Sequence, residues 1–278
     1  MYFAGVDIGS TMTKVVIMDE EIRGCIIGPT GAEHRRLANR VMEEALEQAN
    51  LAFDEISYVV ATGYGRINVP FADKQITEIT CHAKGVSSLF PTVRIAIDIG
   101  GQDAKAIKIA NDKVVGFIMN DKCAAGTGRF LEVIAEALGL KLEEMGEISL
   151  KSKRQVSISS TCTVFAEQEV VSRIADGVAI EDILAGLHEA ISSRVYRMAE
   201  RLRIEPDVVL TGGVAKNIGV VKAMEEHVGS PILVPEEPLL TGAIGAAILG
   251  KELTIKAIES GRPIERGSRR LEAATFFK

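Results

Sequence analysis

The chain contains the same local pattern twice, and this repeat limits the folds that it can adopt. Each copy has an apolar strand ending in an aspartate, then a glycine turn, then a second strand; the copies span residues 5–17 and 95–109. Asp98 follows Asp7 by 91 positions, a period too long for a solenoid and suited to two domains built on one plan. We therefore expect an α/β protein of two similar lobes, each opening with a β-hairpin.

The remaining hydrophobic patterns predict the other helices and strands. Helices are predicted over residues 37–49, 77–89 and 128–138 and from about 163 and 217, and strands over 56–61, 156–160 and 207–213. Gly242 and Gly245 share one face of a helix predicted over 240–249, so this helix can pack closely on another and cross between the lobes. We assign residues 1–92 plus 240–278 to an N-terminal lobe with a returning C-terminal helix, and 93–239 to the second lobe.

The composition argues against several classes of protein. The 278 residues, 47% of them hydrophobic, can form two lobes with cores of their own. A net charge of −6 and the absence of a dense Lys/Arg cluster before the tail argue against nucleic-acid binding. The first residues lack a signal-peptide pattern, and no apolar run approaches the ~18 residues of a membrane span. We expect a cytoplasmic protein that binds neither nucleic acid nor membrane.

Three glycine turns, at residues 7–14, 98–103 and 211–217, are candidate phosphate-binding elements. A glycine lets backbone N–H groups approach phosphate oxygens closely. One such turn alone is more often an ordinary hairpin, but three in this order favour a nucleotide site. Neither a Walker sequence nor Gly-x-Gly-x-x-Gly is present. We expect instead that two lobes clamp the β- and γ-phosphates, with Asp7 and Asp98 facing a shared magnesium ion through water.

The same turns resemble the two phosphate motifs and the adenosine motif of the actin, sugar-kinase and heat-shock-chaperone superfamily. The resemblance rests on Asp7-Ile8-Gly9-Ser10-Thr11, Asp98-Ile99-Gly100-Gly101-Gln102-Asp103 and Thr211-Gly212-Gly213-Val214-Ala215-Lys216-Asn217. It implies a duplicated two-lobe actin-like ATPase fold with ATP or ADP and Mg²⁺ in the cleft between the lobes.

The resemblance also implies a role for each residue. Phosphate would be held by Ser10, Thr11 and Lys14 on one side and by Gly100 and Gly101 on the other. Adenosine would be held by Gly212, Gly213 and Asn217. The catalytic set would be Asp7, Asp98, Gln102 and Asp103. Either Gln102 or Asp103 would orient the attacking water, and the sequence does not choose because both side chains can accept a hydrogen bond from water.

Two cysteine segments resemble a narrower family, the ATP-dependent activators (component A) of 2-hydroxyacyl-CoA dehydratases and related benzoyl-CoA reductase subunits. They are Asn120-Asp121-Lys122-Cys123-Ala124-Ala125-Gly126-Thr127-Gly128-Arg129-Phe130 and Ser159-Ser160-Thr161-Cys162-Thr163-Val164-Phe165-Ala166-Glu167. Residues 61–66 and 72–79 share the resemblance but are equally readable as structural turns. The resemblance implies a homodimer with one [4Fe–4S] cluster at its two-fold axis, held by Cys123 and Cys162 of each subunit.

The settings of the cysteines agree with this expectation. Cys123 and Cys162 each precede a predicted helix, whose free N–H groups and positive end favour a thiolate and an anionic cluster. An arbitrary cysteine pair at this spacing would more often be buried packing residues, and only the flanking motifs reverse that expectation. Cys25 and Cys81 lack this setting and are expected to pack in the core, and His82 is expected to be a satisfied polar group rather than a metal ligand.

These features together predict an ATPase coupled to electron transfer. Ferredoxin or flavodoxin would reduce the cluster, ATP would change the angle between the cluster-bearing helices, and hydrolysis would make the transfer one-way. The electron acceptor would be a partner iron–sulfur enzyme, either a 2-hydroxyacyl-CoA dehydratase or a related reductase.

Two other functions and the role of the tail stay open. The chain is also readable as a small-molecule kinase, for example of an amino sugar, with Asp98 or Asp103 as the base. A third interpretation is a non-enzymatic ATP-dependent interaction module whose cysteine face is a dimer contact. The tail from Lys251, in which we expect a helix, is either a partner contact or a solvated end.

Overall fold

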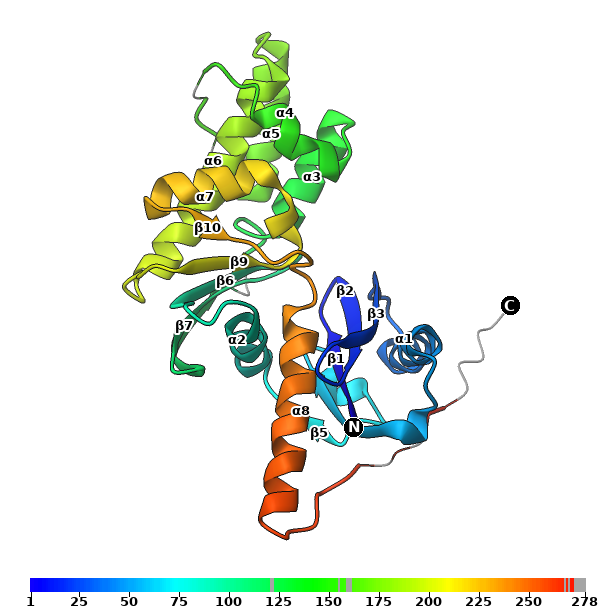
Figure 1. The fold of residues 1–278 in the computed structure, drawn as a ribbon. Coiled ribbons are helices and arrows are strands. Elements are labelled where there is room, and N and C mark those ends of the chain that lie inside the picture. Colours follow the sequence, from blue (N-terminus) through cyan, green and yellow to red (C-terminus); the bar gives the residue numbers. More distant parts are fainter. Residues whose placement is uncertain (121–122, 155, 159–161, 268, 270, 273–278) are drawn as a thin grey trace, which may run out of the picture. The chain divides into compact units, whose positions relative to one another are not determined.

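The computed structural model describes residues 1–278 except 121–122, 155, 159–161, 268, 270 and 273–278. The chain divides into two compact units (Figure 1). Unit 1 comprises Met1–Pro91, Asn111–Val114 and Leu239–Lys278, and unit 2 comprises Thr92–Ala110 and Val115–Pro238. Within the described residues each unit contains one five-stranded sheet.

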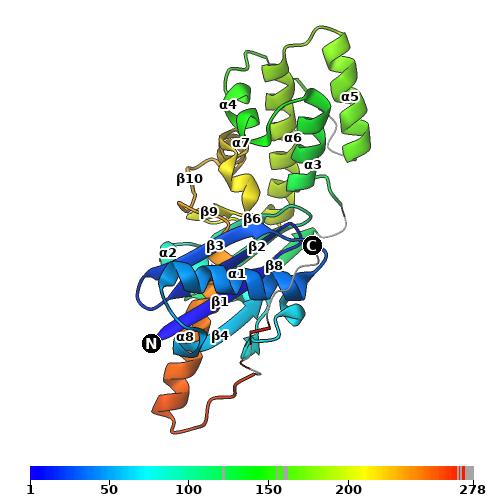
Figure 2. The ribbon, with the colours of Figure 1, turned by 90° about the vertical axis from the view of Figure 1, so that its right-hand side faces the viewer.

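The sheet of unit 1 has the strand order β3-β2-β1-β4-β5. Its strands are β1 (Tyr2–Ile8), β2 (Met12–Met18), β3 (Ile22–Pro29), β4 (Ile56–Thr62) and β5 (Lys74–Gln75). The first three run antiparallel to one another, and β4 runs parallel to β1. Strands β1 and β2 are largely apolar because both of their faces are covered. Alternate residues pack against α1 (His34–Ala49), which lies across the sheet in Figure 2, and against α8 (Thr241–Glu259).

Glycines bring the backbones of unit 1 into direct contact. A Cβ atom on Gly245 of α8 would lie 1.8 Å from the carbonyl oxygen of Cys81 in α2 (Glu78–Leu89), and one on Gly85 of α2 would lie 1.9 Å from that of Thr241. Gly5 of β1 approaches α8 in the same way, at 1.9 Å from the carbonyl oxygen of Ala243. The close packing predicted for the 240–249 helix is therefore confirmed, although α8 continues to Glu259 and belongs to unit 1.

The sheet of unit 2 repeats the connections of the first sheet. Its order is β10-β9-β6-β7-β8, formed by β6 (Ile95–Ile99), β7 (Ala104–Ala110), β8 (Lys113–Asn120), β9 (Val208–Thr211) and β10 (Ile232–Leu233). Strands β6 to β10 thus take the places of β1 to β5, and the sequence repeat predicts this for the hairpins β1–β2 and β6–β7. The third strand of each hairpin, β3 or β8, was not predicted.

Helices form one large core with the second sheet. They are α3 (Gly128–Leu138), α4 (Met145–Ser149), α5 (Thr163–Ala175), α6 (Ile180–Glu200) and α7 (Ile218–Val228). Short 3-10 helices lie at Phe53–Glu55, Arg66–Asn68, Leu142–Glu144 and Gly213–Lys216. The predicted helices at 128–138 and from 163 are confirmed. The strand predicted over 156–160 is wrong for residues 156–158, because this segment packs against α6 (a Cβ on Gly186 would lie 2.0 Å from the Val156 oxygen); residues 159 and 160 lie outside the described part.

The C-terminal tail packs on its own chain. A helix continues only to Glu259, and the described residues beyond Gly261 have no regular structure. The guanidinium of Arg269 donates hydrogen bonds to the carbonyl oxygens of Ile56 and Ser57 and lies 5.4 Å from the ring centre of Phe53. Glu272 N–H donates to Asn39 Oδ1 at 2.8 Å. This part of the tail is therefore not a solvated end, and residues 275–278 lie outside the described part.

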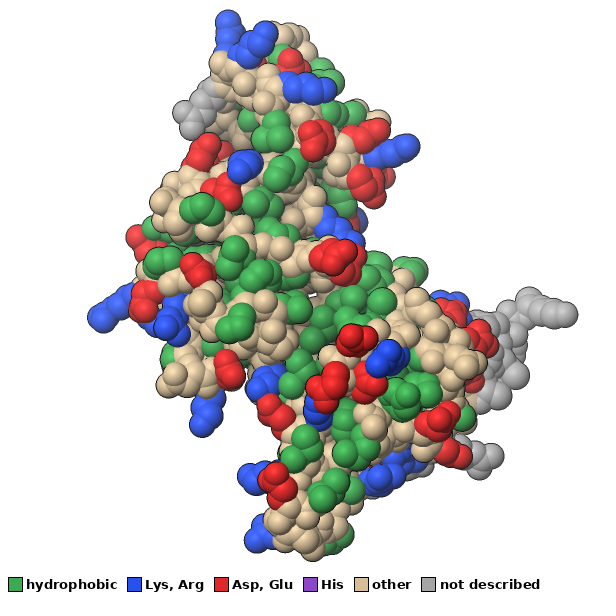
Figure 3. Space-filling model, in the orientation of Figure 1, with side chains coloured by type: hydrophobic (Ala, Val, Ile, Leu, Met, Phe, Trp, Pro, Cys, Tyr) green, Lys and Arg blue, Asp and Glu red, His purple; other side chains and the backbone are tan. Residues whose placement is uncertain are grey.

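The charge distribution on one face and the lengths of the helices bear on the expected absence of nucleic-acid and membrane binding. Figure 3 shows acidic and basic side chains interspersed over the visible face rather than gathered in one basic patch. In the same part of the chain, every helix is too short or too polar to span a bilayer.

Candidate functional site

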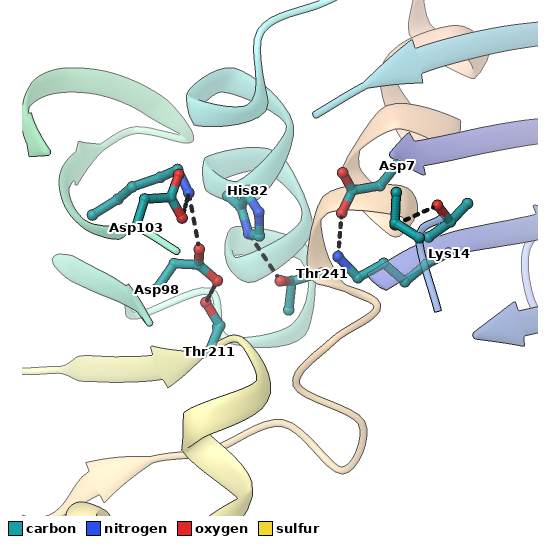
Figure 4. Close-up of polar contacts among 10 residues, drawn as sticks. Asp7, Lys14, His82, Asp98, Asp103, Thr211 and Thr241 are labelled. Atoms are coloured by element: carbon teal, nitrogen blue, oxygen red, sulfur yellow. Dashed lines mark hydrogen bonds and ion pairs between the residues drawn. The ribbon is translucent and has the colours of Figure 1, made fainter. Parts of the chain in front are cut away.

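The aspartate of the first hairpin is held by a lysine on the opposite strand. Asp7 and Lys14 are register partners on β1 and β2. Lys14 Nζ donates to Asp7 Oδ2 at 3.0 Å, and the two side chains are only 11% and 4% exposed, the lysine first (Figure 4). Two charges buried this deeply are tolerated because each compensates the other. The sequence motif assigned Lys14 to phosphate and Asp7 to magnesium, and the structure brings the two side chains together.

The second hairpin repeats this ion pair with an additional carboxylate. Asp98 faces Lys105 across β6 and β7. Lys105 Nζ lies 3.4 Å from Asp98 Oδ2 and 2.8 Å from Asp103 Oδ1, and Thr211 Oγ1 donates to Asp98 Oδ1 at 3.0 Å (Figure 4). Lys105 was not predicted from the sequence. The signal was present, because an aspartate is followed by a lysine seven positions later in both copies of the repeat.

The two candidates for orienting water have different surroundings. Asp103 is paired with Lys105, whereas the side chain of Gln102 is exposed. The contact with Lys105 fixes the Asp103 carboxylate and offsets its charge, whereas the exposed Gln102 amide can turn towards a water molecule and both accept from it and donate to it. The geometry therefore favours Gln102.

The glycine turns of the two hairpins are anchored differently. In unit 1, Ser10 and Thr11 lie in the turn between β1 and β2, Gly9 N–H donates to Met12 O at 3.1 Å, and Thr30 N–H donates to Thr11 O at 2.7 Å. This turn is therefore fixed within its own sheet.

In unit 2, the carbonyl oxygens of the turn are bound to a helix. Gly100 O accepts from Gly128 N–H at 2.8 Å, and Gly101 O accepts from Arg129 N–H at 2.9 Å. Gly128 and Arg129 are the first residues of α3, whose free N–H groups need acceptors. The phosphate turn of unit 2 is thus attached to the helix that follows Cys123.

The third glycine turn, which contains Gly212 in unit 2, has a counterpart in unit 1. Gly212 has a φ of +82° and Gly63 has a φ of +84°. A Cβ on Gly212 would lie 2.9 Å from Asp98 Oδ1, and one on Gly63 would lie 2.4 Å from Asp7 Oδ1. Only glycine fits both the backbone angle and the space. The 61–66 segment is therefore the unit 1 equivalent of the Thr211–Gly213 turn.

Asn217 begins the helix that follows this third turn. Gly213 opens the 3-10 helix Gly213–Lys216, and Asn217 is the N-cap of α7, where its Oδ1 accepts from Gly219 N–H and Val220 N–H at 3.0 and 3.2 Å. The structure thus brings Gly212, Gly213 and Asn217 into one continuous turn. Their contact with adenosine stays a prediction.

The two candidate cluster ligands lie in partly exposed settings in unit 2. Cys123 and Cys162 are half-buried free thiols, and Cys162 is the N-cap of α5. Asn120 Nδ2 donates to Cys123 O at 3.1 Å and to Ala125 O at 3.3 Å, which fixes the loop before α3. The motif residues 121–122 and 159–161 lie outside the described part. No group of three or more potential metal ligands occurs among the described residues.

The other cysteines and His82 have structural settings. Cys81 is buried, and burial raises the pKa of its thiol to about 12, so it stays protonated and unreactive. Cys25 is a half-buried thiol on β3. His82 Nδ1 lies 3.0 Å from Thr241 Oγ1.

Comparisons with known proteins fit this geometry. The profile of the BadF/BadG/BcrA/BcrD ATPase family matches residues 4–250. The activator of lactoyl-CoA dehydratase from Anaerotignum propionicum is 47% identical over 265 residues, which cover 92% of this chain and all of that protein. A benzoyl-CoA reductase component from Thauera aromatica is 32% identical, covering 89% of this chain and 92% of that protein.

Solved structures agree at the level of the fold. The activator of the 2-hydroxyisocaproyl-CoA dehydratase from Clostridium difficile with bound ADPNP has a TM-score of 0.88 and 45% identity, covering 95% of this chain and 99% of that one. More distant actin-like proteins, at 14–16% identity, match with TM-scores of 0.55–0.59 and show the fold alone. The two-lobe α/β fold expected from the repeat, and its actin-like form implied by the resemblance of the glycine motifs, are confirmed.

Proposed function

Because the chain belongs to the BadF/BadG/BcrA/BcrD ATPase family, we propose that it is an ATP-dependent electron donor that activates a 2-hydroxyacyl-CoA dehydratase or a related reductase. One observation carries the proposal. The first two N–H groups of α3 donate to the carbonyl oxygens of Gly100 and Gly101, so a candidate phosphate turn and the Cys123 segment are attached to the same helix. A change at the nucleotide would therefore reach the cysteines through hydrogen bonds of one unit.

The nucleotide would be ATP with Mg²⁺. Lys14 and the turn containing Ser10 and Thr11 would bind phosphate, together with the backbone of the Gly100–Gly101 turn, and Asp7 and Asp98 would bind magnesium through water. Gln102 would orient a water molecule whose oxygen attacks the γ-phosphorus while the bond to the bridging oxygen breaks, giving ADP and phosphate. Lys105 would hold Asp98 and Asp103 in place.

The donor set fits an iron–sulfur cluster shared by two copies of the chain. One chain offers two half-buried thiols, Cys123 and Cys162, whereas a [4Fe–4S] cluster needs four thiolates. Helix α5, which begins directly after Cys162, buries Ala166 and Val170 but exposes apolar side chains. These are Val164, Phe165, Val171 and Ile174, at 57%, 63%, 53% and 40% exposure. Such a face beside a ligand supports a homodimer.

Electron flow would begin at a reduced ferredoxin or flavodoxin and end at the partner enzyme. When bound, the cluster would take up one electron and release it again at low potential. Binding of ATP at the Gly100–Gly101 turn would shift α3 and, through the packing of α3 on α5, both cysteine segments. Hydrolysis would then prevent the electron from returning to its donor.

Anaerobic purification tests this proposal. We expect a dimer with about two iron and two sulfide ions per chain and a broad visible absorption that disappears on reduction. Cys123→Ala and Cys162→Ala should each lose the iron, while Cys25→Ala serves as the matched control and should retain it. Oxidation of the reduced dimer by a purified dehydratase or reductase should require ATP. Iron-free protein from anaerobic cells, or electron transfer at full rate without ATP, would overturn the proposal.

A further inference from the structure

A row of three polar side chains, two buried and one half-buried, joins three helices of unit 2 beside the third glycine turn. His188 of α6 lies between Ser149, at the end of α4, and Asn217, at the start of α7. His188 Nδ1 is 2.9 Å from Ser149 Oγ, and His188 Nε2 is 3.1 Å from Asn217 Nδ2. The histidine is 1% exposed, and neither the phosphate turns nor the cysteine segments make use of it.

The partners determine where the protons of this row lie. Asn217 Oδ1 accepts from two backbone N–H groups at the start of α7, so Nδ2 is the atom that faces His188 and donates to Nε2. Ser149 Oγ–H donates to Gly146 O at 2.7 Å, so the Nδ1–H of His188 must donate to Ser149 Oγ. The ring is therefore neutral, with its proton on Nδ1. Burial lowers the pKa of His188 to about 4, so the ring keeps this form near neutral pH.

The surroundings leave these side chains little room to move. A Cβ on Gly219 would lie 2.3 Å from both His188 Nδ1 and Ser149 Oγ, and one on Gly146 would lie 2.9 Å from Asn217 Oδ1. Glycine is needed at both positions because the row fills the space between the helices. The orientation of the Asn217 amide is thereby fixed.

Because its amide is fixed, Asn217 also determines the geometry of the glycine turn that precedes it. Its N–H donates to Val214 O at 2.9 Å and closes the 3-10 helix Gly213–Lys216, while its side chain caps α7. The residue thus sets the angle at which the turn enters the helix. Loss of the bond to His188 would leave the amide held only by its two capping bonds and would relax the backbone from Gly213 onward.

We propose that His188 is a positioning residue for adenosine binding, which fixes Asn217 and, through it, the Gly212–Gly213 turn that receives the adenosine part of ATP or ADP. This inference rests on the proposed function, because it takes the third glycine turn as the adenosine site. It adds a residue from α6 that the glycine motifs do not contain. His188 acts through Asn217 and does not touch the nucleotide.

The test compares three variants in the full-length dimer. His188→Ala removes the acceptor for Asn217 Nδ2 and should weaken ADP binding and raise the KM for ATP about tenfold, as expected for one lost hydrogen bond, with kcat unchanged at saturating ATP. His188→Gln can supply an acceptor and a donor from one side chain and should recover most of the affinity. Ser192→Ala is the matched control: it removes another α6–α7 hydrogen bond, from Ser192 Oγ to Val220 O, and should leave the KM as in the wild type.

Each outcome decides between a positioning role and a purely structural one. A change in KM with kcat retained, rescued by His188→Gln, supports the proposal. Unchanged ADP affinity in His188→Ala overturns it, and so does an equal loss in Ser192→Ala. If His188→Ala does not fold, His188→Leu takes its place, because it fills the same space without an acceptor for Asn217 Nδ2, and it should show the same rise in the KM for ATP. Failure of the wild-type protein itself to bind ADP or ATP would instead overturn the proposed nucleotide site.

Discussion

The two hairpins share one plan and differ in what their turns are attached to. Both place an aspartate opposite a lysine and a positive-φ glycine beside the aspartate. In unit 1 the turn is bonded to Thr30 of the same sheet, whereas in unit 2 its carbonyl oxygens are bonded to the first two N–H groups of α3. Duplication thus accounts for the two candidate phosphate turns, and the divergence of unit 2 connects one of them to the cysteine segment.

The largest effects are expected at the buried lysines. Lys105→Met should lower the free energy of unfolding by about 4 kcal/mol and Lys14→Met by about 3 kcal/mol, because each leaves a buried carboxylate uncompensated. The effect is larger in unit 2 because Lys105 holds two carboxylates, Asp98 and Asp103, whereas Lys14 holds Asp7. Urea unfolding monitored by circular dichroism measures both values.

The double variant Lys105→Met/Asp103→Asn checks the cause. It should recover part of the loss, since one of the two uncompensated charges is removed. Lys113→Met, at an exposed position of β8, is the control and should be close to neutral. Equal losses at Lys14 and Lys105, or no recovery in the double variant, would contradict the role of the second carboxylate.

The loss of stability caused by a glycine-to-alanine change at a close backbone contact should also differ between the units. Gly245→Ala places a methyl group 1.8 Å from a carbonyl oxygen of helix α2 and should destabilise by about 3 kcal/mol. Gly186→Ala creates a similar clash, at 2.0 Å from Val156 O. Residues 156–158 are not held in a helix or strand, so we expect this segment to shift and the loss to be smaller, about 1 kcal/mol.

The matched control is Gly116→Ala, whose methyl group would meet only a leucine methyl carbon at 3.5 Å. Thermal unfolding of the three variants gives the ranking. A loss at Gly186 as large as that at Gly245 would show that the 156–158 segment is as rigid as a helix.

Measurements of ATP hydrolysis test whether the turn of unit 2 orients the attacking water. Gln102→Ala should lower kcat for ATP hydrolysis about 100-fold, the effect typical of one lost catalytic contact, with ADP affinity retained. Asp103→Asn should have a smaller effect, because its carboxylate is already paired with Lys105. Phosphate release under steady-state conditions measures both. The reverse ranking would assign the water to Asp103, and full activity in both variants would exclude the two residues.

The repeat made much of this arrangement predictable. The two hairpins, the helices at 128–138 and from 163 and the small-residue face of α8 follow from local patterns, and the family resemblance read from the glycine and cysteine motifs is confirmed. The edge strands β3 and β8 were missed. β8 alternates half-buried and exposed positions, and its exposed residues include Val115, Phe117 and Met119, so the usual contrast of apolar and polar residues is absent.

The site was predicted less completely for a physical reason. Glycine turns are visible in a sequence because few residues can replace glycine there. Lys105 and His188 act through contacts made by folding. Lys105 joins the carboxylate of Asp98 on β6 to that of Asp103 in the turn before β7, and His188 joins residues that are 39 and 29 positions away. Only the spacing of Asp98 and Lys105, read against that of Asp7 and Lys14, gave a signal in advance.

Acid should destabilise unit 2 through its buried histidine. Burial lowers the pKa of His188 to about 4, below the ~6.5 of an unfolded chain, so the unfolded state binds more protons and stability falls as the pH drops from about 6.5 towards 4. Between about pH 7.5 and about pH 5.5 this histidine should account for a loss of about 1 kcal/mol. His188→Gln should remove that part of the pH dependence. An identical pH profile in the variant would mean that another group is responsible.

The smallest effect is expected at the tail, which packs on unit 1. Arg269→Ala removes two hydrogen bonds to the start of β4 and the contact with Phe53, and we expect a loss of about 1 kcal/mol because the groups left behind can be solvated. Arg266→Ala, a neighbouring exposed position, is the control. The loss should appear in the free energy of unfolding but not in the KM for ATP. The reason is that Arg269 contacts none of the three glycine turns among the described residues. A raised KM in Arg269→Ala would show that a change at the start of β4 alters the Thr62–Gly63 turn at the end of the same strand. The glycine turns of unit 1 would then also depend on a contact distant from them.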